Sequence, residues 1–293
     1  SGLGIFMKVF PVVRLSGVLM TGTFLSLSFA VSAAVAADTN TTSHSSRYDD
    51  IILVTETRTQ RPLVQSLSSV SVLTENDIKR SQAQSLPALL ASLPGIDHDH
   101  SGGRGSMASL RVRGTESDHV LVLIDGVRTA SATSGSTALE HIPLAHIERV
   151  EVVLGPRSSL YGADAIGGVI QVFTKKGQDG ISASTRLEYG SHEYEKVTLG
   201  TRGGASSGLG ESQFALTLNH EKNEGISRKH PAFLADKDKD NYRASSASAN
   251  VSHTFNNDLA LSIGFLRTEG ETEYDSGTKN DHAKFVNESR RVG

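Results

Sequence analysis

Residues 147–170 read IERVEVVLGPRSSLYGADAIGGVI, and they predict two strands joined by a glycine-rich connection. The valines at positions 150, 152 and 153 belong to a strand that ends at Gly155-Pro156, and residues 169–173 form the second strand. Four glycines could suggest a phosphate-binding loop: Gly155, Gly162, Gly167 and Gly168. No Gly-Lys-Ser/Thr follows them, so turn geometry is the favoured reason for their presence.

The residues before this stretch complete a compact α+β domain, which we assign to residues 61–177. A strand is expected over residues 69–73, and Thr74 with Asp77 three residues later predicts a helix start. Leucines at 86, 89, 90 and 93 follow at helical spacing, and Pro94-Gly95 stops the helix. Further strands are predicted over residues 110–112 and 120–124, with a tight turn at Asp125-Gly126 and a short helix near Pro143.

The residues after this domain, 178–293, predict long strands in which apolar and polar side chains alternate. Leucine or phenylalanine at 214, 216 and 218 alternates with Ala215, Thr217 and Asn219, and residues 181–189 and 259–265 behave in the same way. Segments of roughly ten residues with one apolar face are typical of membrane β-barrels, although a soluble β-sandwich alternates too.

The first residues, 1–37, predict a secretory signal peptide with a few residues upstream of Met7. Lys8 and Arg14 precede an apolar segment that ends in the small residues of positions 32–37. The apolar segment is shorter than the roughly 20 residues of a transmembrane helix. Residues 38–60 form a polar leader interrupted by the apolar run Ile51-Ile52-Leu53-Val54-Thr55, which suits pairing with another chain by strand addition. The alternative is a strand of the domain's own sheet.

Several motifs together resemble the TonB-dependent outer-membrane receptor family, over residues from about 50 to 174 and more loosely to the end. The run Asp50 to Glu56 resembles the TonB box. The plug signatures of the family are matched by Leu93-Pro94-Gly95-Ile96, by Arg113-Gly114, by residues 119–128 and most specifically by residues 147–170. Within the family, the chain is most similar to the branch that imports cobalamin.

The resemblance implies an α+β plug domain followed by the first strands of an antiparallel transmembrane β-barrel. Family barrels have about 22 strands, and only five or six fit after residue 173, so the barrel is expected to be incomplete in this chain and the chain a fragment. The implied location is the bacterial outer membrane, with plug and box accessible from the periplasm. The implied partners are TonB with ExbB and ExbD, outer-membrane lipid, and a ligand that is cobalamin or a ferric siderophore.

The resemblance also implies site residues. The TonB box comprises Asp50, Ile51, Ile52, Leu53, Val54, Thr55 and Glu56. Ligand contacts are expected from two externally facing plug loops, at Ser101, Gly102, Gly103, Arg104, Ser106, Met107, Ser109, Arg128, Ser134 and Ser136. Backbone and small polar groups there suit a large amide-rich ligand. Plain solvent-exposed loops are the alternative.

An acidic loop could bind calcium through Asp236, Asp238 and Asp240, because oxygen-rich clusters bind that ion and the cobalamin branch has a matching loop. The intervening Lys237 and Lys239 weaken this assignment. His98, Asp99 and His100 could hold a transition metal, but a solvated loop is the preferred interpretation. Arg149, Glu151 and Arg157, beside Arg113, are interpreted as structural ion pairs that hold the plug to the barrel wall.

Other function classes fit the sequence less well. A net charge of −3 gives no basic surface for nucleic acid, and the absence of cysteine excludes disulfides and thiolate sites. No Ser/His/Asp or paired-carboxylate arrangement has a defensible spacing, so an enzyme is not supported. The alternative functions are an iron-siderophore or haem receptor and, less favoured, a soluble secreted β-rich binding protein.

Overall fold

The computed structural model describes residues 52–53, 55–56, 61–66, 68–100, 102–130, 135–226, 239–276 and 279–292. The predicted signal peptide and most of the leader lie outside the described residues. So do these predicted site residues: Asp50, Ile51, Val54, Ser101, Ser134, Asp236 and Asp238.

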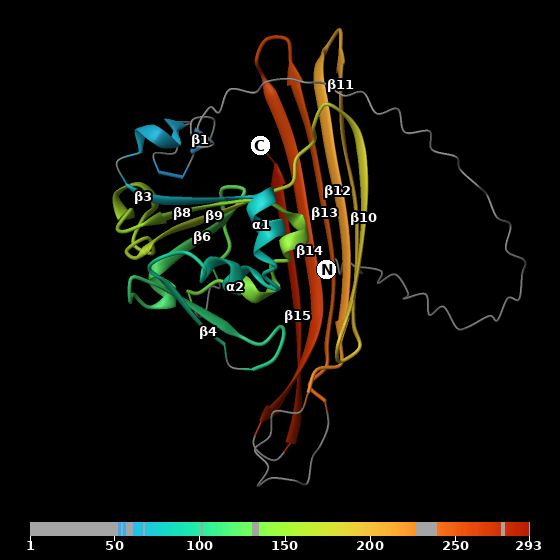
Figure 1. Cartoon of the computed structure of the whole chain (residues 1–293). Helices are drawn as coiled ribbons and strands as arrows, with labels where there is room; N and C mark the ends of the chain where they lie inside the picture. Colours follow the sequence, from blue (N-terminus) through green and yellow to red (C-terminus); the bar gives the residue numbers. More distant parts are fainter. Residues whose placement is uncertain are drawn as a thin grey trace, which may run out of the picture. The chain divides into compact units, whose positions relative to one another are not determined.

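A five-stranded sheet, here called the plug sheet, forms the centre of the first half of the chain (Figure 1). Its strands lie in the order β3 (Ser69–Thr74), β8 (Ile147–Leu154), β9 (Gly168–Thr174), β6 (Val120–Ile124) and β7 (Val127–Arg128). β6 and β9 are parallel and the other neighbouring pairs are antiparallel. The sequence motif of residues 147–170 therefore contributes to β8 and β9, two neighbouring inner strands of the sheet, and the prediction of two strands is confirmed.

Both faces of the plug sheet are buried, which explains why β6 reads as a continuous apolar run. Val120, Val122 and Ile124 belong to a large apolar cluster on one face, whereas Leu121 and Leu123 pack on the other with Tyr161. The large cluster also contains the leucines of the helical segment and Leu266 from the second half of the chain.

The helices of the plug are short. Thr74 caps α1 (Glu75–Ser81) in a reciprocal capping box with Asp77, as predicted. α2 (Leu86–Leu90) ends three residues earlier than the leucine spacing predicts, so Leu93 lies outside it. The remaining helical turns are η1 (Leu63–Gln65), η2 (Ser117–His119), η3 (Leu139–His141), η4 (Leu144–His146) and α3 (Ser158–Tyr161). No helix in the described part of the chain is long and apolar enough to cross a membrane.

Two small antiparallel pairs flank the plug sheet. β1 (Ile52–Leu53) pairs with β2 (Arg61–Pro62), so the predicted box does not join the plug sheet in this structure. β4 (Ile96–His100) pairs with β5 (Ala108–Val112) and carries the first predicted ligand loop between them. Figure 1 places β1 and β4 at opposite ends of the plug.

Six long antiparallel strands, here called the wall, form the second half of the chain in sequential order. They are β10 (Gly180–Gly190), β11 (Tyr194–Ser207), β12 (Gly210–Asn223), β13 (Tyr242–Phe255), β14 (Ala260–Ser276) and β15 (Lys279–Val292). β10 and β15 are the edges, so the wall is not closed within the described residues. The predicted fold class, an α+β plug followed by an incomplete antiparallel barrel, is confirmed.

The wall strands have the predicted alternation. On β12, Ala215, Thr217 and Asn219 are buried, while Phe214, Leu216 and Leu218 are exposed on the opposite face. On β13 and β14 most buried side chains are also polar or small, including Ser246, Ser248, Asn250 and Thr268, whereas Leu266 is an apolar exception that packs on the plug core. An exposed apolar face and a polar inner face are what a lipid-embedded barrel requires.

Candidate functional site

The inner end of the predicted box is fixed to the plug by Thr55. Both its backbone N–H and its hydroxyl donate to Oε2 of Glu151, at 2.9 and 2.6 Å. The Thr55 hydroxyl also lies 3.1 Å from Oε1 of Gln171, and the Thr55 carbonyl accepts a 2.8 Å hydrogen bond from Tyr161 Oη. Thr55 and Glu151 are fully buried, so these bonds form away from competing water.

The residues around Thr55 extend this attachment. Leu53 is buried, and Ser68 donates to Oε1 of Glu56 at 2.6 Å. Arg157 Nη2 donates to the same Ser68 hydroxyl. The docked segment is therefore held by the buried side chain of Leu53, by two hydrogen bonds from Thr55 to the buried Glu151 carboxylate of the plug and by polar contacts around Ser68.

The contacts of Arg149, Glu151 and Arg157 correct one prediction. Arg149 Nε donates to Glu151 at 3.1 Å, and its guanidinium lies over the Phe173 ring. Among the described residues these charges join parts of the plug to one another and to the box, not to the wall. Charge alone predicts the wall-directed role, and charge gives no information about the direction in which each side chain leaves the plug.

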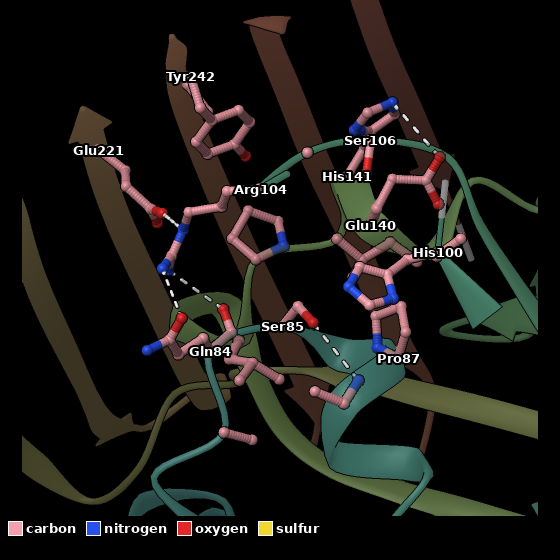
Figure 2. Close-up of a pocket in the computed structure, with 18 of the residues that line it drawn as sticks. Gln84, Ser85, Pro87, His100, Arg104, Ser106, Glu140, His141, Glu221 and Tyr242 are labelled. Atoms are coloured by element: carbon pink, nitrogen blue, oxygen red, sulfur yellow. Dashed lines mark hydrogen bonds and ion pairs between the residues drawn. The ribbon is translucent and has the colours of Figure 1, made fainter. Parts of the chain in front are cut away.

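The first predicted ligand loop is held against the wall by Arg104, as Figure 2 shows. Arg104 pairs with Glu221 of β12, donates to Oε1 and the carbonyl of Gln84 at 3.0 and 3.3 Å, and lies over the Tyr194 ring. Its guanidinium is thus already engaged. In this structure Arg104 positions the loop and also lines the cavity beside it, and its contact with a ligand stays a prediction.

The loop borders a cavity of about 470 Å³ between plug and wall. Its lining includes four of the predicted ligand residues, namely Gly102, Gly103, Arg104 and Ser106. The wall contributes Lys196, Asn219, Glu221 and Tyr242, and the plug adds His98 and His100. A second cavity of about 410 Å³ is lined by the predicted residues Met107, Ser109 and Ser136.

Arg128 is separate from both cavities. Its Nη1 lies 2.6 Å from Oδ2 of Asp164, and its Nη2 donates to the carbonyl of Tyr161. The structure therefore brings seven of the predicted ligand residues to two neighbouring cavities and directs Arg128 to the α3 segment instead.

Glu140 and His141, on η3, line both cavities and were not singled out from the sequence. Glu140 Oε1 lies 3.8 Å from His141 Nε2 (Figure 2). Burial raises the pKa of Glu140 above its ordinary value, against the backbone hydrogen bonds of Glu140 and Ala108, and burial lowers the pKa of His141 to about 4. A neighbouring Glu-His pair in a polar segment is common in loops, so only the fold could identify it.

A row of hydrogen bonds made by His146, Thr174 and Lys175 joins the plug to β13. His146, at the end of η4, has Nδ1 2.7 Å from Ser248 Oγ and Nε2 2.7 Å from Ser246 Oγ. Asn250, two residues further along the same face of β13, donates to Thr174 Oγ1 at 3.0 Å and to the Lys175 carbonyl at 2.8 Å. Ser, Ser and Asn at alternate positions of a strand are the sequence signal that could have pointed to this inner face.

An ionic cluster joins α1 to β11. Glu75 lies 3.2 Å from Arg202 Nη2, 3.4 Å from Lys175 Nζ and 3.0 Å from Lys79 Nζ. Burial alone would raise the pKa of Glu75, but the hydrogen bond from Lys79 and the charges of Lys175 and Arg202 hold it below its ordinary value. With the Arg104–Glu221 pair, this cluster provides ion pairs between plug and wall, which the sequence predicts at other residues.

The predicted calcium loop is described only at its end. Lys239, beside Asp240, pairs with Glu224, the residue that follows β12, and Asn241 N–H donates to Glu273 at 3.1 Å. Within the described ranges no group of three or more His, Asp or Glu side chains is arranged to hold a metal ion. Calcium binding by Asp236, Asp238 and Asp240 stays a prediction.

Comparison with known proteins gives one matching family model, the TonB-dependent Receptor Plug Domain, over residues 62–169. The vitamin B12 transporter BtuB of Vibrio cholerae is 36% identical over 236 residues, which cover 79% of this chain and 38% of that protein. The vitamin B12 transporter BtuB of Vibrio vulnificus is 37% identical, with coverage of 79% and 37%. The chain thus spans well under half the length of these curated relatives.

Solved structures with the same fold include two siderophore receptors. The ferripyoverdine receptor of Pseudomonas aeruginosa matches with a TM-score of 0.63 at 17% identity, covering 77% of this chain and 28% of that chain. The siderophore receptor PiuA of Acinetobacter baumannii matches with a TM-score of 0.59 at 21% identity, covering 74% and 28%. These likenesses concern the fold.

Proposed function

Because the chain belongs to the TonB-dependent receptor family, we propose that the protein is an outer-membrane active transporter that imports cobalamin. In this proposal TonB, working with ExbB and ExbD, supplies the energy through the box at residues 50–56. The outer membrane has no nucleotide supply or ion gradient of its own, so the work must arrive through a partner. The proposed function assigns no catalytic reaction to the protein.

The longest connection between the wall strands supports a direction for transport. Outer-membrane barrels have short periplasmic turns and longer extracellular loops. β11 and β12 are joined by residues 208–209 alone, whereas residues 224–241 join β12 to β13 at the other end. The long connection lies at the end where Thr272 donates to the carbonyl of Gly105, 3.3 Å away, so the cavity loop faces the exterior.

The attachment of the box to the plug is the main observation that supports the proposal. Thr55 attaches the box to the central strands of the plug, and Figure 1 shows β1 at the opposite end of the plug from the hairpin that carries the cavity loop. An apolar strand at the periplasmic end can add to the edge of a partner sheet. Tension on that strand would act directly on Glu151 in β8 and Gln171 in β9.

The choice of cobalamin rests on the two vitamin B12 transporters that are 36% and 37% identical to this chain. The cavity lining agrees with a large amide-rich ligand, since it offers backbone, hydroxyl, imidazole and carboxyl groups. An iron-siderophore receptor is the second candidate, because siderophore receptors share the fold.

The test is equilibrium binding to the full-length receptor in detergent, with cyanocobalamin and a ferric siderophore as competing ligands. We expect saturable cobalamin binding that the siderophore does not displace. Siderophore binding without cobalamin binding would overturn the choice of ligand and leave the transporter assignment standing. Repeating the titration with calcium chelated shows whether Asp236, Asp238 and Asp240 contribute through a bound ion.

A further inference from the structure

The carboxyl group of Glu140 is the most unusual polar group at the two cavities. Its side chain is only 9% exposed, yet Oε2 has no hydrogen-bond partner within 3.5 Å among the described residues. A buried carboxyl oxygen without a partner is costly, because it has lost water and gained nothing in exchange. Such a group is rare in a folded protein and needs a reason.

The charges nearest the larger cavity do not supply a partner for Glu140. Arg104 and Lys196 both lie on Glu221, with Lys196 Nζ 3.8 Å from Glu221 Oε2. His141 is the only ion-pair neighbour of Glu140 in the described ranges. Burial lowers the pKa of His141 to about 4, so its imidazole is neutral near pH 7 and gives Glu140 no countercharge.

Glu140 lies at the border of both cavities. It lines each of them, so a ligand that fills either one would lie beside its side chain. Figure 2 shows Glu140 and His141 joined by a dashed line above His100, with Arg104 directed away toward Glu221. The metal alternative is weak, because no three-ligand group is arranged for an ion in the described ranges.

We propose that Glu140 is a specificity-determining residue that hydrogen-bonds a primary carboxamide of the ligand. This inference rests on the proposed function and deepens it by naming the ligand group that is read. A carboxylate accepts from the amide N–H, and a protonated carboxyl also donates to the amide carbonyl. Either form of Glu140 is therefore complementary to a carboxamide.

The same residue discriminates against anionic ligands. A ligand carboxylate at this position would face the Glu140 carboxylate in a site that excludes water, and such like-charge contacts are strongly unfavourable. Protonation of Glu140 would relieve only part of the unfavourable free energy of this contact. A receptor with this residue thus prefers amides over the acids formed by their hydrolysis.

The experiment replaces the carboxyl group of Glu140 in the protein and, separately, one carboxamide group in the ligand. Binding of cyanocobalamin and of its derivatives with one peripheral carboxamide hydrolysed to a carboxylate is measured with full-length wild-type receptor, Glu140→Gln and Glu140→Ser. The control is Asp179→Asn, which removes an exposed carboxylate in the segment between β9 and β10. Retention of the folded barrel is checked by its resistance to detergent denaturation.

We expect the wild type to bind one of the derivatives about tenfold or more weakly than cyanocobalamin. Glu140→Gln should bind that derivative at least as tightly as it binds cyanocobalamin, because its amide now pairs with the ligand carboxylate. Glu140→Ser should recover part of the difference by removing the charge, and Asp179→Asn should match the wild type.

Two outcomes overturn the inference. One is a wild-type receptor that binds every derivative as tightly as it binds cyanocobalamin. This measurement needs no variant, so it tests the inference even if the substitutions prevent folding. The other is a wild-type preference that Glu140→Gln and Glu140→Ser leave unchanged. Failure of the proposed function is a different result, namely a wild-type receptor that binds no cobalamin at all.

Discussion

Thr55 and Glu151 lie 96 positions apart in the sequence, and one carboxylate oxygen of Glu151 accepts both the backbone N–H and the hydroxyl of Thr55. The two bonds tie an end of the chain's first described segment to a central strand of the plug sheet. Hydrogen bonds to a buried charged group are stronger than neutral ones. The box is therefore held in a defined docked state, and its release requires that these two hydrogen bonds break.

Tyr161→Phe should make the box easier to release. The change removes the 2.8 Å hydrogen bond from Tyr161 to the Thr55 carbonyl and leaves the box sequence itself unaltered. One such bond is worth about 0.5–1.5 kcal/mol, so the released population should rise roughly 2- to 12-fold. The affinity for the purified periplasmic domain of TonB, measured by calorimetry, should rise by the same factor.

The matched control is Tyr189→Phe, which removes a hydroxyl from an exposed tyrosine on β10. It should bind the TonB domain as the wild type does. An unchanged affinity for Tyr161→Phe would mean that docking of Thr55 does not limit access to the box.

The strands of the fold could be predicted from local patterns. Valine-rich runs indicate β8 and β9, period-two alternation indicates the wall strands, and Thr74 with Asp77 locates the start of α1. The end of α2 could not be placed, because Leu93 has the spacing of a helical residue but packs against the core from the turn that follows. Helical spacing and core packing produce the same pattern over one turn.

The site was predictable only where a local motif marks it. The box and the first ligand loop are each contiguous in sequence, so the family resemblance assigns both to definite residues, and their roles stay predictions. The roles of Arg104, Glu140 and His146 depend on partners far away in sequence, such as Glu221 and Ser248. No spacing rule relates those positions, and only the packing of plug against wall brings them together.

His146 should make the attachment of plug to wall sensitive to acid. Burial, with smaller contributions from the charges of Lys175 and Lys196, lowers the pKa of His146 to about 3. In the unfolded chain the pKa is about 6.5. The folded state favours neutral histidine, so this stability is complete above about pH 6.5 and is lost as the pH falls toward 3, by at most about 1.4 kcal/mol per pH unit.

The measurement is thermal unfolding in detergent between about pH 7.5 and pH 5, above the range in which most carboxylates titrate. His146→Gln keeps polar groups near Ser246 and Ser248 but does not titrate, so its melting temperature should fall less with acid than that of the wild type. His141→Gln should also reduce the fall of the melting temperature with acid, since burial lowers the pKa of His141 to about 4. Identical pH profiles for all three proteins would contradict the assignment.

Glu75→Gln should loosen α1 from the wall. The substitution removes the negative charge that Lys175 and Arg202 share. Lys175 is largely buried, and burial already lowers its pKa, so losing its partner leaves an uncompensated charge between plug and wall. Hydrogen exchange of the peptide that contains α1 should accelerate by roughly tenfold or more.

Lys79→Ala is the control for this change. Lys79 also contacts Glu75, at 3.0 Å, but its side chain is 55% exposed and the pair is a surface i,i+4 contact. Such pairs contribute little. Exchange of the α1 peptide should therefore stay within a few-fold of the wild type, and equal acceleration in both variants would mean that the buried contacts to Lys175 and Arg202 are not what holds α1.

Gly105→Ala should disturb the cavity loop through a steric conflict with the wall. Gly105 has φ +74°, and a Cβ added there would collide with the Tyr242 ring and lie 2.6 Å from Thr272 Oγ1. The loop must then move away from β13 and β14, which breaks the hydrogen bond from Thr272 to the Gly105 carbonyl. We expect cobalamin affinity to fall at least tenfold, because the ligand loop no longer holds its position.

Gly114→Ala separates this conflict from backbone strain. Gly114 has nearly the same φ, +77°, but nothing lies within 4 Å of an added Cβ. Both variants thus carry the cost of a left-handed alanine, about 1 kcal/mol, and only Gly105→Ala carries the clash. Thermal unfolding should shift slightly for Gly114→Ala with unchanged ligand affinity, whereas Tyr242→Ala added to Gly105→Ala should restore part of the lost affinity. If Gly114→Ala weakened binding as much as Gly105→Ala, contact between the loop and Tyr242 could not be the cause.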